Sequence, residues 1–253
     1  MGSIVAQADN GMSHRWLTLR FDAPIMAFGG VAIDQVGPTR QFPTASMLTG
    51  LIGNALGWNW SDRGWHQDLQ GRLVFAARLD QDGVLVEDNQ NAQLARSDKG
   101  WTSFGCPEGR AGASYGAPHR RFREYLADAS VRVVLRLRAE DQSPRLKELA
   151  DAFEQPARPL YIGRKPCLPS MPFLEPGQNR WIVAETAWAA LCAIPGTPPR
   201  FRFRAQWPVG EGPRAGECFG CIIDMPDLRN WHTGLHAGAR QIIDGWVRSS
   251  ETT

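Results

Sequence analysis

The side chains best suited to binding a phosphate lie in an arginine-rich stretch near the middle of the chain. Between residues 110 and 138 there are seven arginines and one histidine, against only Glu124 and Asp128. Within this stretch, residues 119–126 also carry two aromatic rings, Phe122 and Tyr125. Guanidinium groups neutralise phosphates and flat rings stack on unpaired bases, so the pattern indicates a site for single-stranded nucleic acid. A solvated strand face that is merely rich in arginine is the alternative interpretation.

A second candidate anion site is the turn Gly163-Arg164-Lys165, which follows a short apolar run. Backbone amides in a glycine-containing turn can hold an anion, and the two cations can neutralise a second phosphate. The turn lacks the Gly-Lys-Ser/Thr ending that a nucleotide-triphosphate loop requires. An ordinary exposed turn could have the same composition.

The same regions contain groups that could cleave RNA without a metal ion. Such cleavage needs a base for the 2′-hydroxyl and a cation for the charge that develops on the phosphorane. Tyr115, His119 and Lys165 supply groups of these kinds. A metal-independent endoribonuclease is therefore the first alternative function.

A zinc-bearing interaction module is the second alternative. The residues Cys218, Cys221, His232 and His236 follow the order of a zinc finger, and ten residues separate the two pairs. Met225-Pro226 interrupts the expected strand pattern, and buried thiols with surface histidines would account for the same residues. The odd count of five cysteines argues for reduced thiols rather than a disulfide framework. We expect no metal or other cofactor.

The composition is that of a soluble globular protein, because 43% of the 253 residues are hydrophobic and 21% are charged. No apolar run approaches the roughly 20 residues that a membrane-spanning helix needs. Residues 1–13 are polar and lack the apolar centre of a signal peptide, so we expect a disordered leader or cloning remnant on a cytoplasmic protein. The net charge of +2 does not by itself indicate a nucleic-acid-binding protein.

The first elements that must position these groups are a strand and a helix. Residues 16–21 alternate as a strand, and a helix should begin at Pro43 or Thr44 and end near Gly57. Gly50 and Gly53 would let that helix pack closely against a sheet, at some cost in helix propensity.

Two hairpins should follow. Residues 73–79 and 84–86 flank an Asp-Gln-Asp-Gly sequence, which is a strong hairpin turn signal. Residues 119–126 and 131–138 form a second pair of strand-like runs with a short connection. In the last run, Arg132 and Arg136 alternate with apolar side chains and should point to the opposite face of the sheet.

The remaining elements complete an α+β pattern. A helix should start at Ser143 and Pro144, and a strand should occupy residues 160–162. The order strand, helix, two strands, helix and strand is a split βαβ arrangement with insertions, which many RNA-binding domains use. Further on, residues 184–193 look helical, residues 201–205 alternate as a strand, and the rest to Trp246 looks irregular.

Three motifs occur one after another along the chain: Phe-Pro-Thr-Ala-Ser at 42–46, Phe-Arg-Glu-Tyr-Leu-Ala-Asp-Ala at 122–129 and Pro-Leu-Tyr-Ile-Gly-Arg-Lys-Pro-Cys at 159–167. Together they resemble the CasD family of CRISPR-associated proteins, the type I-E Cascade members of the RAMP superfamily. The resemblance covers roughly residues 15–173 and fades after Pro176.

The resemblance implies an RRM-like or ferredoxin-like palm at residues 14–175, with a thumb inserted at about 89–118 and a C-terminal extension at 176–253. It also implies a non-catalytic subunit that holds the 5′ handle of the CRISPR RNA, caps the backbone filament and contacts the large subunit. A separate subunit would cut the RNA, and target DNA would be read by guide pairing.

The residues that the arginine-rich run, the glycine turn and the resemblance assign to RNA are Arg40, Thr44, Ser46, Arg96, Lys99, Arg110, His119, Arg120, Arg121, Phe122, Arg123, Tyr125, Tyr161, Gly163, Arg164 and Lys165.

Overall fold

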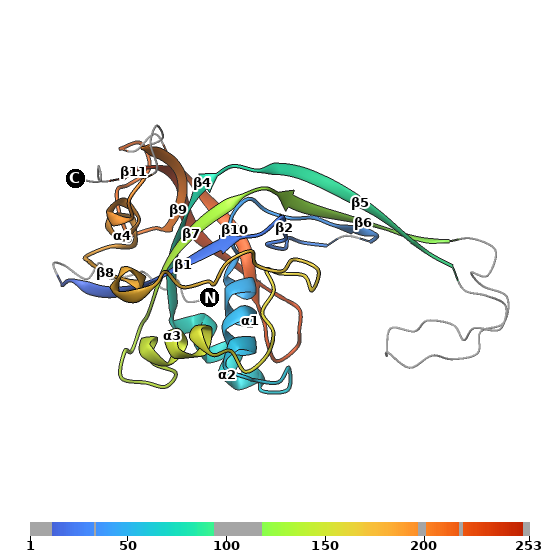
Figure 1. Ribbon diagram of the computed structural model, residues 1–253, viewed down its shortest axis with the longest axis horizontal. Coiled ribbons are helices and arrows are strands. Elements are labelled where there is room, and N and C mark those ends of the chain that lie inside the picture. The colour runs from blue at the N-terminus through green and yellow to red at the C-terminus, as the bar shows by residue number, and fades with distance from the viewer. Residues whose placement is uncertain (1–11, 33, 94–117, 197–200, 218–219, 250–253) are drawn as a thin grey trace.

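The structure, a computed structural model, describes residues 12–32, 34–93, 118–196, 201–217 and 220–249. Within these ranges, four α-helices and two β-sheets form a mixed α+β fold (Figure 1). The α+β class expected from the sequence is therefore confirmed. No helix in the described ranges is both long enough and apolar enough to cross a lipid bilayer.

The larger sheet has seven strands, and every neighbouring pair in it is antiparallel. Its order is β10-β11-β9-β4-β7-β1-β8. The strands are β1 (His14–Asp22), β4 (Leu73–Gln81), β7 (Ser130–Leu137), β8 (Trp181–Ala184), β9 (Arg202–Pro208), β10 (Cys221–Arg229) and β11 (His236–Arg248). The expectation that the chain is irregular after residue 205 is wrong, because β10 and β11 form a long antiparallel pair.

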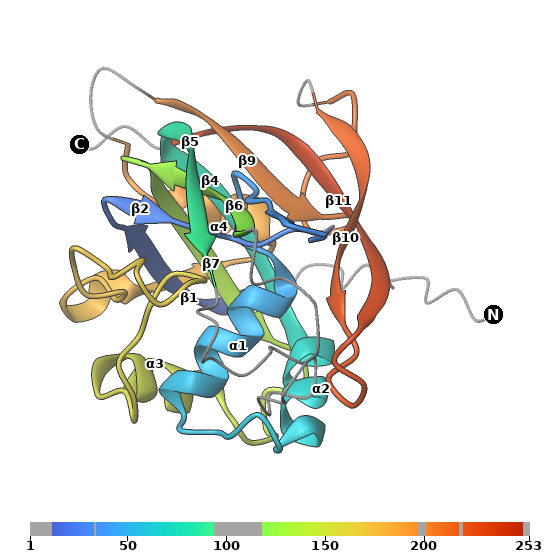
Figure 2. The ribbon, with the colours of Figure 1, turned by 90° about the vertical axis from the view of Figure 1, so that its right-hand side faces the viewer.

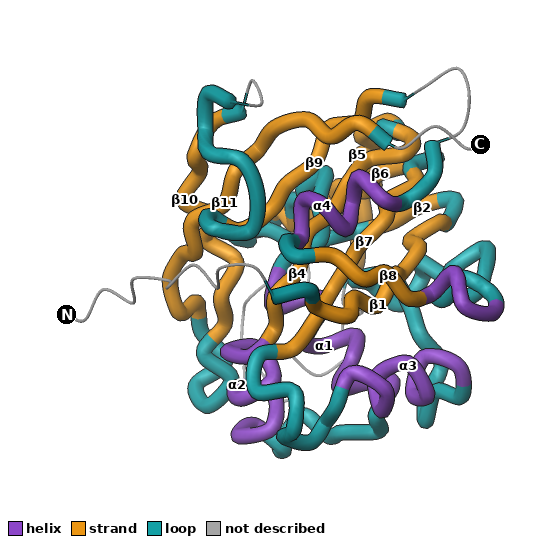
Figure 3. Tube along the Cα trace, turned by 90° about the vertical axis from the view of Figure 1, so that its left-hand side faces the viewer, coloured by secondary structure: helices purple, strands orange, loops and turns teal. Residues whose placement is uncertain are grey.

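Helices cover both faces of this sheet. Helices α1 (Ala45–Ala55), α2 (Arg63–Arg72) and α3 (Leu146–Glu154) lie on one side, and α4 (Ala187–Ala193) lies on the other (Figures 1 and 3). A short 3₁₀ helix, η1 (Gly177–Arg180), precedes β8. Side chains of β7 alternate between two cores: Val133 and Leu135 pack with α1 and α3, whereas Val134 packs with α4.

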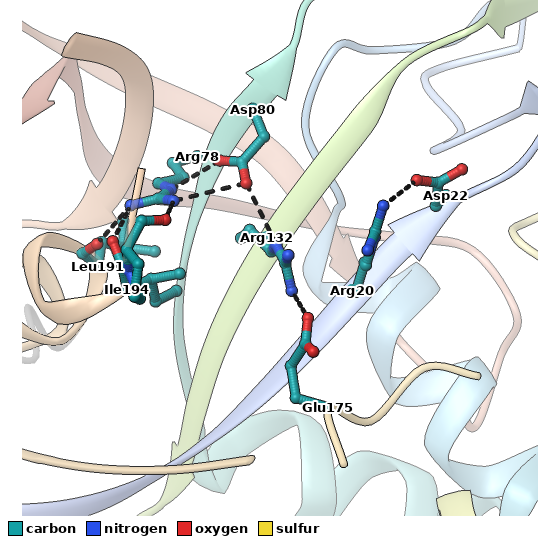
Figure 4. A network of polar contacts seen from close by, with 9 residues as sticks. Arg20, Asp22, Arg78, Asp80, Arg132, Glu175, Leu191 and Ile194 are labelled. Carbon is teal, nitrogen blue, oxygen red and sulfur yellow. Dashed lines mark hydrogen bonds and ion pairs between the residues drawn. The ribbon is translucent and has the colours of Figure 1, made fainter. Parts of the chain in front are cut away.

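The second face of the central strands is therefore a packed interior. Arg78 of β4 is fully buried there and donates to the carbonyl oxygens of Leu191 and Ile194, at 3.0 and 2.7 Å (Figure 4). Its Nε also bonds the Asp80 carboxylate at 2.7 Å. Buried charge persists only where partners replace the lost water, and this network supplies them.

Arg132 and Arg136 of β7 belong to the same interior. Arg132 bonds Asp80 at 3.2 Å and also pairs with Glu175 (Figure 4), and Arg136 bonds Glu211 at 2.7 Å. Burial lowers the pKa of Arg132 from its usual range, and the attraction of Asp80 opposes that shift. The interpretation of this sheet face as a cationic surface is therefore wrong for these two arginines.

The two predicted hairpins are also wrong. Strand β4 pairs with β7, and β5 (Val84–Ala92) pairs with β6 (His119–Ala127). The chain thus runs outward through β4 and β5 and returns through β6 and β7 as one long ribbon that extends from the body (Figure 1). The short strands β2 (Ile25–Met26) and β3 (Val36–Gly37) pair with the other edge of β6.

The ribbon passes from the seven-stranded sheet to the smaller sheet at a break that interrupts both of its strands, between β4 and β5 and between β6 and β7. Gly83 has φ +69° and Asp128 has φ +52°, and the pairing resumes on either side at Gln81–Ser130 and Val84–Ala127. A Cβ on Gly83 would lie 2.6 Å from the carbonyl oxygen of Ala127. The Asp-Gly sequence that signals a turn therefore makes a bend within a continuing strand pair.

The structure differs from the sequence predictions in three smaller respects. Residues 160–162 form no strand, although Ile162 accepts a hydrogen bond from the Ala27 amide and donates one to Cys167. The strand that follows α3 in the large sheet is β8, which pairs with β1. Helix α3 has Arg145 as its N-cap, and the Ser143 hydroxyl bonds Glu148 in the first turn.

We predict that Gly83→Ala destabilises the fold by about 1–3 kcal/mol, because alanine at positive φ is strained and its methyl group would meet Ala127 and Ala129. Chemical unfolding measures the change. The control is Gly71→Ala in α2, where a Cβ meets no atom within 4 Å. That substitution should stabilise the helix by up to about 1 kcal/mol. Equal effects of the two substitutions would contradict the bend.

We also predict that Asp80→Ala lowers the free energy of unfolding by about 3 kcal/mol, because it leaves Arg78 and Arg132 without their shared carboxylate. The matched control is Asp151→Ala, which removes an exposed i,i+4 pair with Lys147 and should change stability by less than about 0.5 kcal/mol. Denaturant titration measures the free energy of unfolding of both variants. If the two losses were equally small, Asp80 would belong to a surface ion pair rather than to a structural network.

Candidate nucleic-acid-binding cleft

A cleft of about 950 Å³ lies where the loop after β2, helix α1 and the β10–β11 hairpin meet. Figure 2 shows α1 with the tip of that hairpin beside α2. One face of α1 lines the cleft along the whole helix, from Ser46 through Gly50 to Asn54. An 11-residue helix is about 16 Å long, so the cleft is long enough for more than one nucleotide.

The cleft collects six of the residues that the sequence assigned to RNA, from two separate stretches of the chain. They are Arg40, Thr44, Ser46, Tyr161, Gly163 and Arg164. Lys165 is exposed just beyond the turn and does not line the cleft. Residues more than a hundred positions apart therefore share one concave surface.

The glycine turn is set by a close backbone contact. Gly163 has φ +84°, and a Cβ there would lie 1.6 Å from the carbonyl oxygen of Ala27. The Ala27 amide donates to the carbonyl of Ile162 at 3.2 Å, which holds the two segments together. Only glycine fits this position, so the turn is needed to shape the cleft.

Arg164 is held by the protein itself. Its guanidinium donates to the carbonyl oxygens of Glu124 at 2.9 Å and Gly37 at 2.7 Å, and it lies 4.9 Å from the centre of the Tyr125 ring. These contacts tie the loop before α1 to β6. The geometry thus favours a structural role for Arg164 over the expected phosphate contact.

The start of α1 already has a carboxylate at its N-terminus. Asp227 of β10, whose side chain is fully buried, accepts from the Ala45 amide at 2.9 Å and pairs with Arg240 at 3.0 Å. Thr44 caps the helix by accepting from the Met47 amide, and its hydroxyl also donates to Phe28. The helix terminus is therefore occupied, and the Ser46 side chain beside it is half-buried in the cleft wall.

Two of the four arginines in the cleft keep their donors available. Within the described residues, the guanidinium groups of Arg40 and Arg229 make no hydrogen bond or ion pair, and the Nε of Arg40 is buried without a partner. Arg158, by contrast, donates to the carbonyls of Gly57 and Trp58. Arg229 escaped the sequence analysis, although its place two residues before Trp231 is a detectable signal.

The candidates on β6 lie on the ribbon, outside the cleft. Arg120 and Arg121 are exposed and pair across the ladder with Asn91 and Gln90, while Asp88 pairs with Arg123. Arg123 donates to the backbone of Gln35. Phe122 and His119, both half-buried, complete this set.

Tyr125 differs from the rest of this set. It is 5% exposed and packs in the main core. Its ring is therefore not available to a base in this arrangement, and we do not retain it as a stacking residue.

The groups proposed for RNA cleavage do not converge among the described residues. His119 begins β6, six residues before Tyr125, which corresponds to about 20 Å along a strand. Lys165 follows Arg164, whose guanidinium contacts the Tyr125 ring. Tyr115, together with Arg96, Lys99 and Arg110, lies outside the described residues.

The zinc-finger arrangement is wrong. Cys221 pairs with Asp244 at one end of the β10–β11 ladder, and His236 pairs with Arg229 at the other end. Eight strand residues separate these ends, about 26 Å, and His232 lies in the turn beyond. Cys218 lies outside the described residues. The described cysteines Cys167, Cys192 and Cys221 are free thiols, and burial raises the pKa of Cys167 and Cys192.

Comparisons with known proteins point to one family. A family model described as CRISPR-associated protein (Cas_Cas5) matches residues 16–243. The CRISPR system Cascade subunit CasD of Escherichia coli (strain K12) is 32% identical over 152 residues. The matched residues cover 60% of this chain and 66% of that relative, just under two thirds of its length.

Two solved structures share the fold. A chain of a CRISPR RNA-guided surveillance complex superposes with a TM-score of 0.63 at 21% identity, covering 92% of this chain and 91% of that chain. A structure titled "Crystal structure of Cas protein" gives a TM-score of 0.56 at 23% identity, covering 92% and 95%.

We predict that the cleft arginines differ in what their removal does to stability. Arg164→Ala should lower the free energy of unfolding by about 2–3 kcal/mol, because it removes charge-assisted bonds to two separate backbone segments. Arg40→Ala should change it by less than about 1 kcal/mol, since no described group depends on its guanidinium. Thermal and denaturant unfolding give both values, and a larger loss for Arg40→Ala would contradict the assignment.

Proposed function

This chain belongs to the Cas5 family of CRISPR-associated proteins, and we propose that it is a non-catalytic RNA-binding subunit of a type I-E-like CRISPR surveillance complex. In this role it grips the 5′ handle of the CRISPR RNA and caps the backbone filament. Guide pairing within the complex, rather than this chain, reads the target DNA.

The observation that carries the proposal is the cleft along α1. It gathers Arg40, Ser46 and the Gly163 turn on one concave surface and leaves the Arg40 donors available. A single RNA strand needs cations for its phosphates and a surface that follows its backbone. The cleft meets both requirements, and the helix of about 16 Å that lines it is long enough for more than one nucleotide.

The strand order supports an RRM-like palm. The order along the chain is β1, α1, β4, β7, α3 and β8, and the adjacent strands run β8-β1-β7-β4. This is the pattern of a split βαβ fold, with both helices on one face. The second face, which many RNA-binding domains present to bases, is covered here by α4, so the proposed RNA site lies in the cleft along α1.

The proposed thumb, at about residues 89–118, begins within β5 and ends where β6 starts. The division into a palm at 14–175 and an extension at 176–253 is a proposal about organisation, and strands from both ranges lie in the large sheet. Val84, Leu85 and Val86 of β5 are exposed on an edge strand. Such an edge suits contact with a neighbouring subunit of the filament.

We predict that the full chain, purified with its partner subunits, brings down a CRISPR RNA with one defined 5′ end. Arg40→Ala should reduce the amount of bound RNA several-fold, because it removes a phosphate contact. The control is Arg248→Ala, which removes an exposed arginine at the far end of β11 and should leave the RNA unchanged.

Two results would contradict the proposal. One is a purified complex that holds no RNA, or RNA with scattered 5′ ends. The other is a specific cut of repeat RNA by the chain alone in EDTA, lost in His119→Ala, which would favour the endoribonuclease instead.

A further inference from the structure

One wall of the cleft is formed by the β10–β11 hairpin and carries an arginine, Arg229, whose guanidinium makes no hydrogen bond or ion pair among the described residues. It is built from Arg229 and Trp231, and it adjoins Trp60, which follows the end of α1.

The tip of the hairpin is fixed rigidly to α2. Gln70 donates to the carbonyl of Arg229 at 2.9 Å and accepts from the Trp231 indole nitrogen at 3.1 Å. Gln67 accepts from the Trp231 amide at 3.0 Å, and Arg63 donates to the carbonyl of His232 at 2.7 Å. The wall is therefore preorganised and does not need to fold around a ligand.

Stacked rings support the wall from behind. The Trp231 ring lies 4.6 Å from the His66 ring at an interplanar angle of 23°, and His66 meets Trp58 edge-on at 5.3 Å. Gly53 of α1 makes room for this stack, since a Cβ there would lie 2.6 Å from His66, whereas a Cβ on Gly50 would meet Trp231 at an ordinary contact distance of 3.6 Å. Both glycines thus face helix α2 and the hairpin, rather than the sheet contact that the sequence suggested.

Arg229 presents its cation at the surface of this stack. Its guanidinium lies 4.9 Å from the centre of the Trp231 ring, its side chain is exposed, and it bonds no group among the described residues. A guanidinium near a ring face can still direct its N–H donors to a phosphate oxygen.

Trp60 supplies an exposed aromatic surface in the lining of the same cleft. Its side chain is 77% exposed, and the Arg63 guanidinium lies 5.0 Å from the ring centre. A large ring left in water at the rim of a cleft is suited to stacking on an unpaired base.

We infer that the β10–β11 hairpin is the second wall of the RNA cleft, with Arg229 contacting a backbone phosphate and Trp60 stacking on an unpaired base. The inference rests on the proposed function and extends it to the C-terminal third of the chain. A cation beside a ring in a groove fits a nucleic-acid strand better than an apolar protein surface, which would leave Arg229 desolvated and unpaired.

The test is a binding titration of the full chain with a fluorescein-labelled single-stranded RNA from the CRISPR repeat. Arg229→Ala should weaken binding about tenfold and reduce the slope of log affinity against log salt by about 0.7, while Arg229→Lys keeps most of the slope. Trp60→Ala should weaken binding by about fivefold or more, and Trp60→Phe should recover part of the loss. Arg248→Ala is the matched charge control, and unfolding curves of all variants should coincide.

RNA that carries 4-thiouridine gives an independent readout by photo-crosslinking. Crosslinks should appear in the peptides that contain Trp60 or Trp231, as well as near Arg40. If Arg40→Ala weakens RNA binding while Arg229→Ala and Trp60→Ala do not, the inference that the hairpin contacts RNA is wrong and the proposed function stands. If Trp60→Ala impairs subunit assembly but not RNA binding, the surface is a protein interface. If the wild-type chain binds no RNA, both proposals fail.

Discussion

The buried carboxylate of Asp227 is the contact on which the shape of the cleft depends. It joins the last strand pair of the chain to the first turn of α1, through the Ala45 amide, and its charge is balanced by Arg240. A carboxylate that is fully enclosed is stable only with such charge-assisted partners. This single group therefore fixes the C-terminal hairpin against the helix that forms the floor of the cleft.

The same need for charge-assisted partners determines which arginines of this chain are held within the fold and which can bind a ligand. Arg78 and Arg132 lie between packed elements, where carbonyl and carboxylate oxygens take up their donors. Arg164 holds the loop before α1 in the same way. Where no such oxygen is bonded among the residues that the structure describes, as at Arg40 and Arg229, the cation remains available to a ligand. A count of basic residues carries none of this information, because the partners come from distant parts of the chain.

Local patterns in the sequence predict local structure well. The apolar alternation of β7 and the Thr44 cap of α1 follow from periodicity and capping chemistry, and both are present. The pairing of β4 with β7 could not be predicted in this way, because an Asp-Gly pair signals a turn whether the chain reverses there or only bends. The strands β10 and β11 were missed because their exposed residues and Met225-Pro226 obscure the alternation that burial would impose.

The candidate site was predictable in part. The Gly163 turn was predicted from its composition, whereas Arg40 was implied by the family resemblance, and both line the same cleft. The arginine–tryptophan pair of Arg229 and Trp231 is visible in the sequence, but its place in the cleft depends on contacts with Gln67 and Gln70 some 160 positions away. Long-range polar contacts of this kind leave no periodic trace in a sequence.

Hydrogen–deuterium exchange of the full chain, with and without bound CRISPR RNA, tests the central claim most directly. The account predicts that RNA protects residues 40–54 and the hairpin tip at 226–236 together, with little change along the β5–β6 ribbon. Protection confined to the ribbon, with the cleft exchanging as in the free chain, would contradict it.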